Sequence, residues 1–229
     1  MKKYIIAIIV AVVLGIISYF PKQDKPIAID VLLIPSEEVY NQALQLNSSI
    51  HHENPTGLKL DENHIPHITL LQCYIQEEDL PKVCKALEGI YKTIEKDTLV
   101  AESLYYSKDT QESFAMIRIE KSKPLIELHK KTITLLKPYM VANGSENAFI
   151  PNPDGRPIRK STIDYVPNFV HNYSFENYDP HISIGMAKTT FLDSLSRTYF
   201  QPLKFRATSV CIYQLGDFGT AQRLFWKSE

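Results

Sequence analysis

Two short segments of the chain repeat one pattern of residue types that can carry acid-base chemistry. Residues 66–70 read Pro-His-Ile-Thr-Leu and residues 180–184 read Pro-His-Ile-Ser-Ile. Side chains alternate between the two faces of an extended strand, so His67 shares a face with Thr69, and His181 shares a face with Ser183. Each segment therefore predicts an imidazole and a hydroxyl side by side on a strand whose other face is anchored in a core.

A pair of histidines can open a strained cyclic phosphodiester. The reaction needs in-line attack by water, removal of a proton from that water, and protonation of the departing ribose oxygen on the opposite side of phosphorus. The imidazole pKa lies near neutrality, so one ring can be neutral and the other protonated at the same pH, each contributing about 10²- to 10⁴-fold. We therefore predict His67 and His181 as catalytic residues, and the sequence leaves open which of them is the acid.

The two hydroxyl residues of the repeated pattern are predicted to bind the phosphate. Thr69 and Ser183 can donate hydrogen bonds to the non-bridging oxygens as negative charge builds during transfer. A cyclic diester carries a single negative charge, so the chemistry demands neither a metal nor another cofactor.

Three tyrosines and two arginines are candidates for contacts to a base or a phosphate. Tyr74 follows the first motif strand, Tyr178 precedes the second, and Tyr213 lies in the penultimate strand, where each can stack on a base. Arg156 and Arg159 make their segment locally basic and can reach a phosphate. The alternative is that these tyrosines belong to the core and these arginines to a solvated loop.

The spacing of His64 and His67 also suits a metal-binding pair on a helix. Pro66 and the strand pattern oppose a helix at this point. Zinc would need further ligands, which only Asp61, Asp179 or His181 offer. A metal site is therefore the less favoured interpretation.

The two motifs occupy similar places in a duplicated succession of elements. The first half predicts a strand at 28–34, a helix capped by Ser36, the motif strand at 66–75, a helix at 81–94 and a strand at 99–106. The second half predicts a strand at 114–119, a helix from Ser122, the second motif strand from Pro180 and a helix at 190–199, then strands at 203–215 and 222–226. The alternation puts Gly185 outward and Met186 inward, and His129 is expected at the surface or boundary of its helix. This layout predicts an α+β fold with two pseudo-symmetric β-α-β-α-β lobes, whose antiparallel sheets face a central cleft with the helices outside.

The second half is longer than the first. The spacing from Ile29 to His67 is 38 positions, whereas that from Phe114 to His181 is 67. A segment at about 143–175, rich in Asn, Pro, Gly and Tyr, accounts for the excess. It is expected to be a long ordered loop or lid, either passive or in contact with the substrate.

The first 24 residues are predicted to lie outside the fold. Lys2 and Lys3 precede an uncharged run at residues 4–20, which is typical of a signal anchor or a signal peptide. An uncleaved anchor with a short linker is favoured because no convincing cleavage site follows. Residues 25–229 would then form a single two-lobed domain that is membrane-anchored and extracytoplasmic, or exported.

Charge and cysteine content narrow the class of ligand. The formal net charge of −1 argues against a long nucleic-acid track and favours a small or end-recognised phosphate. Cys73, Cys84 and Cys211 lack metal-ligand spacing and are expected to be buried, although one pair can be bridged outside the cell. Nothing in the sequence indicates a protein partner.

Over about residues 27–227, the chain resembles the two-histidine (2H) phosphoesterase superfamily. The resemblance rests on the paired motifs, the opening strand with its Ile-Pro-Ser exit into a helix at 34–36, and the duplicated layout. Members include RNA 2′,3′-cyclic phosphodiesterases, enzymes long called 2′-5′ RNA ligases, and 2′-5′ phosphodiesterases. The resemblance implies a metal-independent phosphodiesterase that acts on 2′,3′-cyclic phosphates of nucleotides or RNA ends and leaves a 2′-phosphate. The alternatives are a non-catalytic module that binds a nucleotide or RNA end on the same fold, and 2′-5′ RNA ligase or 2′-5′ phosphodiesterase activity.

Overall fold

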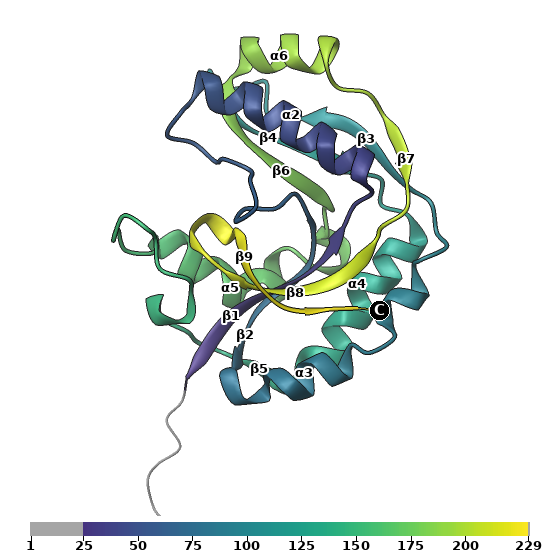
Figure 1. Ribbon diagram of the computed structural model, residues 1–229, viewed down its shortest axis with the longest axis vertical. Coiled ribbons are helices and arrows are strands. Elements are labelled where there is room, and N and C mark those ends of the chain that lie inside the picture. The colour runs from purple at the N-terminus through teal and green to yellow at the C-terminus, as the bar shows by residue number, and fades with distance from the viewer. Residues whose placement is uncertain (1–24, 229) are drawn as a thin grey trace, which may run out of the picture.

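Two antiparallel sheets form the framework of the protein (Figure 1). The structure, a computed structural model, describes residues 25–228. A five-stranded sheet has the order β5-β2-β1-β8-β9, and a four-stranded sheet has the order β6-β4-β3-β7. The strands are β1 (Pro26–Ile34), β2 (Ile68–Gln76), β3 (Leu99–Tyr105), β4 (Glu112–Ile119), β5 (Met140–Val141), β6 (His181–Lys188), β7 (Leu203–Phe205), β8 (Ser209–Leu215) and β9 (Ala221–Lys227). The helices are α2 (Glu37–Glu53), α3 (Leu80–Ala86), α4 (Lys123–Leu136), α5 (Lys160–Asn172) and α6 (Thr189–Thr198). The predicted α+β class with two antiparallel sheets is confirmed.

The central position of β1 follows from its composition. All but the two end residues of β1 are buried, and such a strand needs neighbours on both edges and cover on both faces. β1 accordingly lies between β2 and β8, so that Ile29 is aligned with Cys73 on one side and with Gln214 on the other. Each sheet combines strands from both halves of the chain: β3, from the first half, pairs with β4, whereas β8, from the second half, pairs with β1 and β9 pairs with β8.

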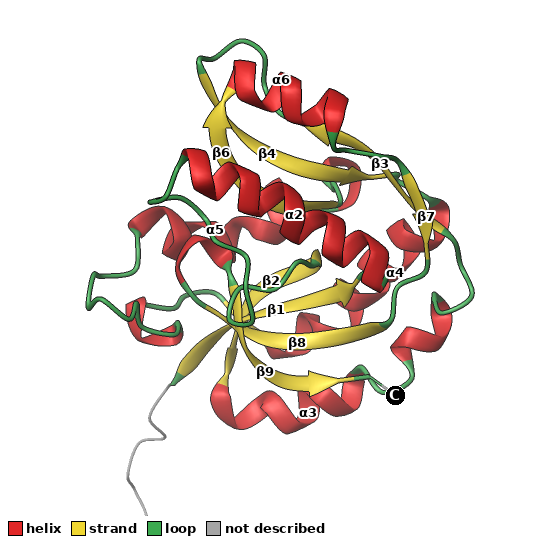
Figure 2. Ribbon diagram, turned by 45° about the horizontal axis from the view of Figure 1, so that its top comes forward, coloured by secondary structure: helices red, strands yellow, loops and turns green. Residues whose placement is uncertain are grey.

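The helices cover the sheets on different faces (Figure 2). α2 and α6 pack on β6 of the four-stranded sheet, whereas α4 and α5 both contact β2 of the five-stranded sheet. In β1, Ile27, Ile29, Val31 and Leu33 join the main hydrophobic core. The alternate residues, which include Asp30, point to the opposite face of the sheet, and a charged residue buried there is unusual.

Two expected elements are interrupted. The strand expected at 203–215 is two strands, because β7 pairs with β3 of one sheet and β8 pairs with β1 of the other. The helix expected at 81–94 ends after Ala86, and Gly89, with φ of +71°, precedes a separate 3₁₀ turn at Ile90–Thr93. A positive φ is incompatible with a continuous right-handed helix, and glycine adopts it without strain.

The segment at 143–175 is not simply the loop or lid that the sequence predicts, because it contains α5. The buried side chains of this helix, Thr162, Val166 and Phe169, recur at helical spacing. Pro167 lies on the exposed side of α5. The abundance of loop-forming residues around α5 obscured this amphipathic pattern.

The predicted membrane segment finds no support in the described chain. Among residues 25–228, no helix is sufficiently long and apolar to cross a bilayer. The signal anchor or signal peptide predicted at residues 1–24, with its membrane segment at 4–20, lies outside the described residues. This finding goes against the prediction of a membrane-anchored or exported protein, and we withdraw that prediction. The three cysteines are free thiols, and Cys84 is only partly buried.

Candidate active site

Each motif strand carries a β-bulge directly after its hydroxyl residue. In β2 the extra residue is Leu70, which follows Thr69, and in β6 it is Ile184, which follows Ser183. One extra residue reverses the alternation of side chains beyond it. Met186, predicted to point inward, is therefore 42% exposed and lines the cavity instead.

The second bulge depends on a glycine. Gly185 has φ of +119°, and a Cβ at this position would lie 2.9 Å from Cγ2 of Ile50 in α2. The side-chain amide of Asn47, also in α2, donates a hydrogen bond of 2.9 Å to the Ile184 carbonyl. Absence of a side chain at Gly185 thus lets α2 pack directly against the strand that carries His181.

Both motif histidines are held by the residue two positions earlier. Nδ1 of His67 lies 2.7 Å from the Ile65 carbonyl, and Nδ1 of His181 lies 2.7 Å from the Asp179 carbonyl. A carbonyl only accepts hydrogen bonds, so Nδ1 carries the proton in each ring and Nε2 is the atom left for chemistry. The proline of each motif lies between the carbonyl and the histidine, where its fixed φ restricts the short turn.

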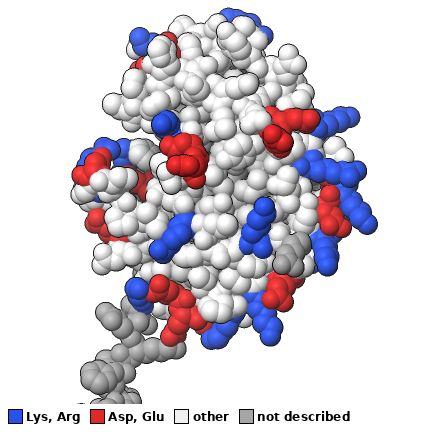
Figure 3. Space-filling model, viewed as in Figure 1, with Lys and Arg blue, Asp and Glu red and all other residues white. Residues whose placement is uncertain are grey.

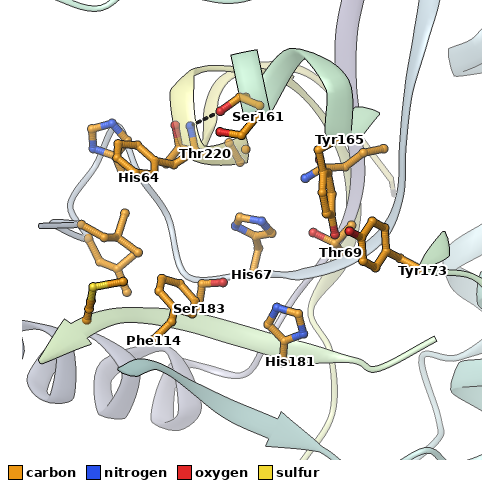
Figure 4. A pocket seen from close by; sticks show the side chains of 18 of the residues that line it. His64, His67, Thr69, Phe114, Ser161, Tyr165, Tyr173, His181, Ser183 and Thr220 are labelled. Carbon is orange, nitrogen blue, oxygen red and sulfur yellow. Dashed lines mark hydrogen bonds between the residues drawn. The ribbon is translucent and has the colours of Figure 1, made fainter. Parts of the chain in front are cut away.

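The two rings share one cavity (Figure 4). The cavity has a volume of about 590 Å³, and both histidines line it together with Thr69 and Ser183. Much of the remaining wall is aromatic or sulfur-containing: Phe114, Tyr165, Tyr173, Met186 and Phe218. Tyr165 and Tyr173 belong to α5 and the turn after it, and their rings stack with centroids 4.5 Å apart. The 143–175 segment therefore forms part of the cavity wall.

Two of the candidate contact residues also reach the cavity. Tyr178 is buried beneath it, where its hydroxyl donates a hydrogen bond of 3.0 Å to the Thr69 carbonyl. The guanidinium of Arg159 lies 3.5 Å from the centre of the Phe218 ring, and its Nε lies 3.5 Å from a carboxylate oxygen of Asp217. Tyr178 offers support from below, whereas Arg159 presents an anchored cation at the wall.

Three candidate contact residues lie elsewhere. Tyr74 is buried and donates a hydrogen bond of 3.0 Å to the Ile163 carbonyl of α5, and burial raises its pKa to about 12. Tyr213 packs against a small apolar cluster of Leu32, Cys211 and Ala221 and does not itself line the cavity. Arg156 is exposed and pairs with Asp154 at 2.6 Å. The structure therefore does not place Tyr74, Tyr213 or Arg156 in the cavity wall.

Asp30 is the main residue of the site that the sequence analysis missed. Its Oδ2 accepts hydrogen bonds from the Thr69 hydroxyl at 2.8 Å and from the Gln72 amide at 2.9 Å. The same oxygen lies 3.5 Å from Nε2 of His67. The bulge at Leu70 allows Thr69 and Gln72, three positions apart, to face one carboxylate. A signal was present, since Asp30 is the single charged residue in the otherwise apolar β1.

A different charged residue lies beside the second motif. Arg118 of β4 is aligned with His181 in the sheet, and its guanidinium lies 3.3 Å from a carboxylate oxygen of Asp179. The guanidinium also lies 3.8 Å from the centre of the Tyr105 ring. The first motif therefore has a buried acid as its neighbour, and the second has a base paired with a half-exposed acid.

These neighbours shift the two imidazoles in opposite directions. Burial acts to lower the pKa of His67, but the hydrogen bond and charge of Asp30, aided by the Ile65 carbonyl, outweigh it and raise that pKa. Burial lowers the pKa of His181, and the positive charges of His67 and Arg118 add to this effect against the opposing influence of Asp179. One ring is thus disposed to carry a proton while the other is neutral.

His129 supports the first motif from below. The prediction of a surface or boundary position is wrong, because His129 is fully buried with its Nδ1 at 2.7 Å from the Leu70 carbonyl. Its Nε2 accepts a hydrogen bond of 3.1 Å from the Phe175 amide, and its ring stacks on Tyr178 at 3.8 Å. Burial lowers the pKa of His129. This neutral ring therefore ties α4 to the bulge in β2.

The structure does not support His64 and His67 as a metal-binding pair. Nδ1 of His64 lies 3.2 Å from a carboxylate oxygen of Asp61, and both residues are in the loop before the first motif. Over residues 25–228, no three His, Cys, Asp or Glu side chains gather as a metal site would require.

Two antiparallel sheets that each present a His-x-Thr or His-x-Ser pair to one cavity define the class of the two-histidine phosphoesterases. A family model described as the 2′-5′ RNA ligase superfamily matches residues 42–217, and the chain belongs to this family.

Three solved structures are weakly similar to this chain. The Escherichia coli LigT apo structure has a TM-score of 0.43 and 10% identity, with 89% of this chain and 98% of that chain covered. Kluyveromyces marxianus Usb1 has a TM-score of 0.35 and 12% identity, with coverages of 89% and 97%. Usb1 with uridine monophosphate has a TM-score of 0.34 and 11% identity, with coverages of 86% and 96%. No curated protein matches the chain.

Proposed function

We propose that this protein is a metal-independent phosphodiesterase that hydrolyses 2′,3′-cyclic phosphates of nucleotides or RNA ends by paired-histidine catalysis. One observation carries the proposal: two carbonyls, each two residues before a motif histidine and each 2.7 Å from its Nδ1, leave both Nε2 atoms for the same cavity. Two imidazoles oriented in the same way, on opposite sheets, match a reaction that needs an acid and a base on opposite sides of phosphorus.

The hydrolysis proceeds in one displacement at phosphorus. One Nε2 takes a proton from water as the water oxygen bonds to phosphorus, and the ester bond on the far side breaks. The other Nε2–H gives its proton to the departing ribose oxygen. The product is a phosphomonoester with a free hydroxyl beside it, and exchange of one proton with solvent restores both rings.

The two hydroxyls differ in availability. The Ser183 hydroxyl has no hydrogen-bond partner among the described residues, so it is free to donate to a non-bridging oxygen as charge builds. The Thr69 hydroxyl already donates to Asp30 at 2.8 Å. Thr69 can therefore bind the phosphate only by exchanging this acceptor, which makes Ser183 the stronger candidate for direct phosphate contact.

The lining of the cavity favours a nucleotide or a single RNA end over a long RNA strand. Arg159 is the one lysine or arginine in the cavity wall of residues 25–228, whereas binding a long strand requires many cations along its track. On the face shown in Figure 3, positive and negative side chains are interspersed rather than gathered by sign. The aromatic wall can stack on a base.

The test is hydrolysis of 2′,3′-cyclic nucleotides by the full chain in the presence of EDTA, with His67→Ala and His181→Ala as variants. We expect turnover by the parent and a loss of about 10²- to 10⁴-fold in kcat for either variant. His52→Ala, at an exposed position of α2, is the matched control and should retain parental activity.

Turnover that depends on added metal would contradict the mechanism, as would full activity in both histidine variants. Binding of cyclic nucleotides without turnover would favour the binding module. Activity restricted to 2′-5′-linked dinucleotides, or joining of RNA ends, would replace the proposed substrate while keeping the same pair of histidines.

A further inference from the structure

Asp30 is a buried acid that the mechanism described so far does not use. Its side chain has no solvent exposure. Burial of a carboxylate is costly unless hydrogen bonds or an opposite charge compensate for it. Thr69 and Gln72 donate to Oδ2, but no described group is within hydrogen-bond distance of Oδ1. Two neutral donors on one oxygen leave most of the negative charge to be balanced by the nearest group that can become a cation.

That group is His67, which faces a hydrogen-bond acceptor at each ring nitrogen. Nδ1 lies 2.7 Å from the Ile65 carbonyl, and Nε2 lies 3.5 Å from Oδ2 of Asp30. A neutral imidazole that is protonated at Nδ1 places only the Nε2 lone pair beside Oδ2 of Asp30, whereas the imidazolium places a positive charge there. His181 is different, because its Nδ1 faces the Asp179 carbonyl while its Nε2 has no hydrogen-bond partner among the described residues.

We propose that Asp30 is a positioning residue that keeps His67 protonated, so that His67 is the general acid and His181 the general base of the hydrolysis. This proposal rests on the proposed phosphodiesterase function. Asp30 acts through His67 and does not touch the substrate. The pKa directions of the two rings agree with this assignment, since Asp30 raises that of His67 while burial lowers that of His181.

The other charges around the rings do not reverse this order. Asp179 lies beside His181, but Arg118 pairs with it at 3.3 Å and Lys121 at 3.7 Å. Arg159 lines the cavity and is paired with Asp217. His64, the remaining histidine of the wall, pairs with Asp61 in its own loop. Asp30 is therefore the one acid in the described chain that contacts a motif ring without a basic side chain of its own.

The assignment fixes the direction of proton flow. Nε2 of His181 removes a proton from the attacking water, the new P–O bond forms, and the bond to the departing ribose oxygen breaks. That oxygen receives the Nε2 proton of His67. His67 ends neutral beside Asp30 and His181 ends protonated, and the next cycle begins after His181 loses a proton to solvent and His67 gains one.

The first test needs no substrate. Histidine ring resonances of the full chain are followed by NMR as a function of pH, with assignments from His67→Gln and His181→Gln. We expect His67 to titrate at a higher pH than His181. Asp30→Asn keeps the size of the side chain but removes its charge, and should lower the titration of His67 by about 1 pH unit or more.

The matched control is Asp79→Asn, which removes the same charge from an acid that pairs with Lys82 outside the cavity wall. This variant should leave both titrations in place. His67 titrating below His181 in the parent would overturn the proposal, and this comparison does not depend on how well the Asp30 variant folds. An unmoved His67 in folded Asp30→Asn would overturn it as well.

The second test is the pH profile of kcat/KM on a 2′,3′-cyclic nucleotide. The falling limb at high pH reports the acid, so Asp30→Asn should shift that limb to lower pH by about 1 unit and leave the rising limb unchanged. Asp79→Asn should leave both limbs unchanged. A shift of the rising limb instead would reverse the roles of the histidines. An absence of turnover with the expected NMR order would reject the cyclic phosphodiesterase while the Asp30–His67 pair stands.

Discussion

The two motif strands have the same local geometry but opposite electrostatic surroundings. In both β2 and β6, a carbonyl two residues before the histidine fixes Nδ1, and a bulge follows the hydroxyl residue. Under the first ring lies the buried acid Asp30, whereas the second ring lies beside Arg118. The comparison teaches that duplicated backbone geometry can aim two identical side chains at one cavity while neighbours on other strands give them different proton affinities.

The largest expected effect on activity comes from replacing both motif histidines together. Because the two rings act in one displacement step, His67→Gln combined with His181→Gln should cost little more than the worse single variant, which itself loses about 10²- to 10⁴-fold. Single-turnover rates of the three variants on a cyclic nucleotide measure this coupling. Losses that multiply in the double variant would show that the two rings act in separate steps.

The bulges offer a second way to separate the motifs. The first bulge has Leu70 followed by a leucine, whereas the second is followed by Gly185 at φ +119°. Gly185→Ala should lower the free energy of unfolding by about 2 to 4 kcal/mol, because a methyl group meets both backbone strain and Ile50. Gly155→Ala, at φ +75° with open space around it, should cost about 1 kcal/mol.

Urea denaturation of the two glycine variants measures the difference. Equal losses would mean that contact with α2 adds nothing beyond the backbone conformation.

Substitutions of Thr69 and Ser183 test whether the buried Asp30 makes the surroundings of the two motifs different. Thr69→Val removes a donor to the buried Asp30 and should destabilise the fold by about 1 to 3 kcal/mol. Ser183→Ala removes a hydroxyl without a partner among the described residues and should change stability by less than about 0.5 kcal/mol. Chemical denaturation compares the two. A similar loss in both would show that Asp30 does not depend on the Thr69 hydroxyl.

The smallest effect contrasts His67 with His129, two rings that both have a carbonyl 2.7 Å from Nδ1. Nε2 of His129 faces the Phe175 amide, so protonation would oppose two N–H groups. Because burial lowers its pKa, His129 contributes stability that is present above the ordinary histidine pKa of 6.5 and is lost as the pH falls below it. Unfolding of the parent and of His129→Gln at pH 8 and pH 5 measures this, and the variant should lose less stability on acidification. An identical pH dependence would exclude His129 as a cause.

Local patterns carried much of the fold and part of the site. The alternation around both motifs and the apolar run of β1 predicted the strands, and the repeated residue types predicted that His67 and His181 would share a cavity. Local patterns do not predict which strands pair with each other. The order of the chain does not indicate that β3 pairs with β4 and β7, or that β8 pairs with β1, which needs a neighbour on each edge.

The missed site features depend on that same pairing. Asp30 lies opposite Gln72 only once β1 and β2 are in register, so one acid in an apolar run had no visible role. Tyr74 lies in the core, the alternative given for it, because α5 buries it. Loop-forming residues around α5 obscured the helical pattern of that segment. Met186 points into the cavity because of the bulge in β6, and the alternation of apolar and polar residues does not reveal a bulge.

The central position of β1 has a consequence for synthesis of the protein. Its two partners come from distant parts of the chain, since Ile29 is aligned with Cys73 and with Gln214. Until β8 leaves the ribosome, one edge of β1 is unpaired, and such an edge recruits other strands. A chain that ends between β6 and β8 is therefore expected to be aggregation-prone rather than half active, even though it already contains both histidines.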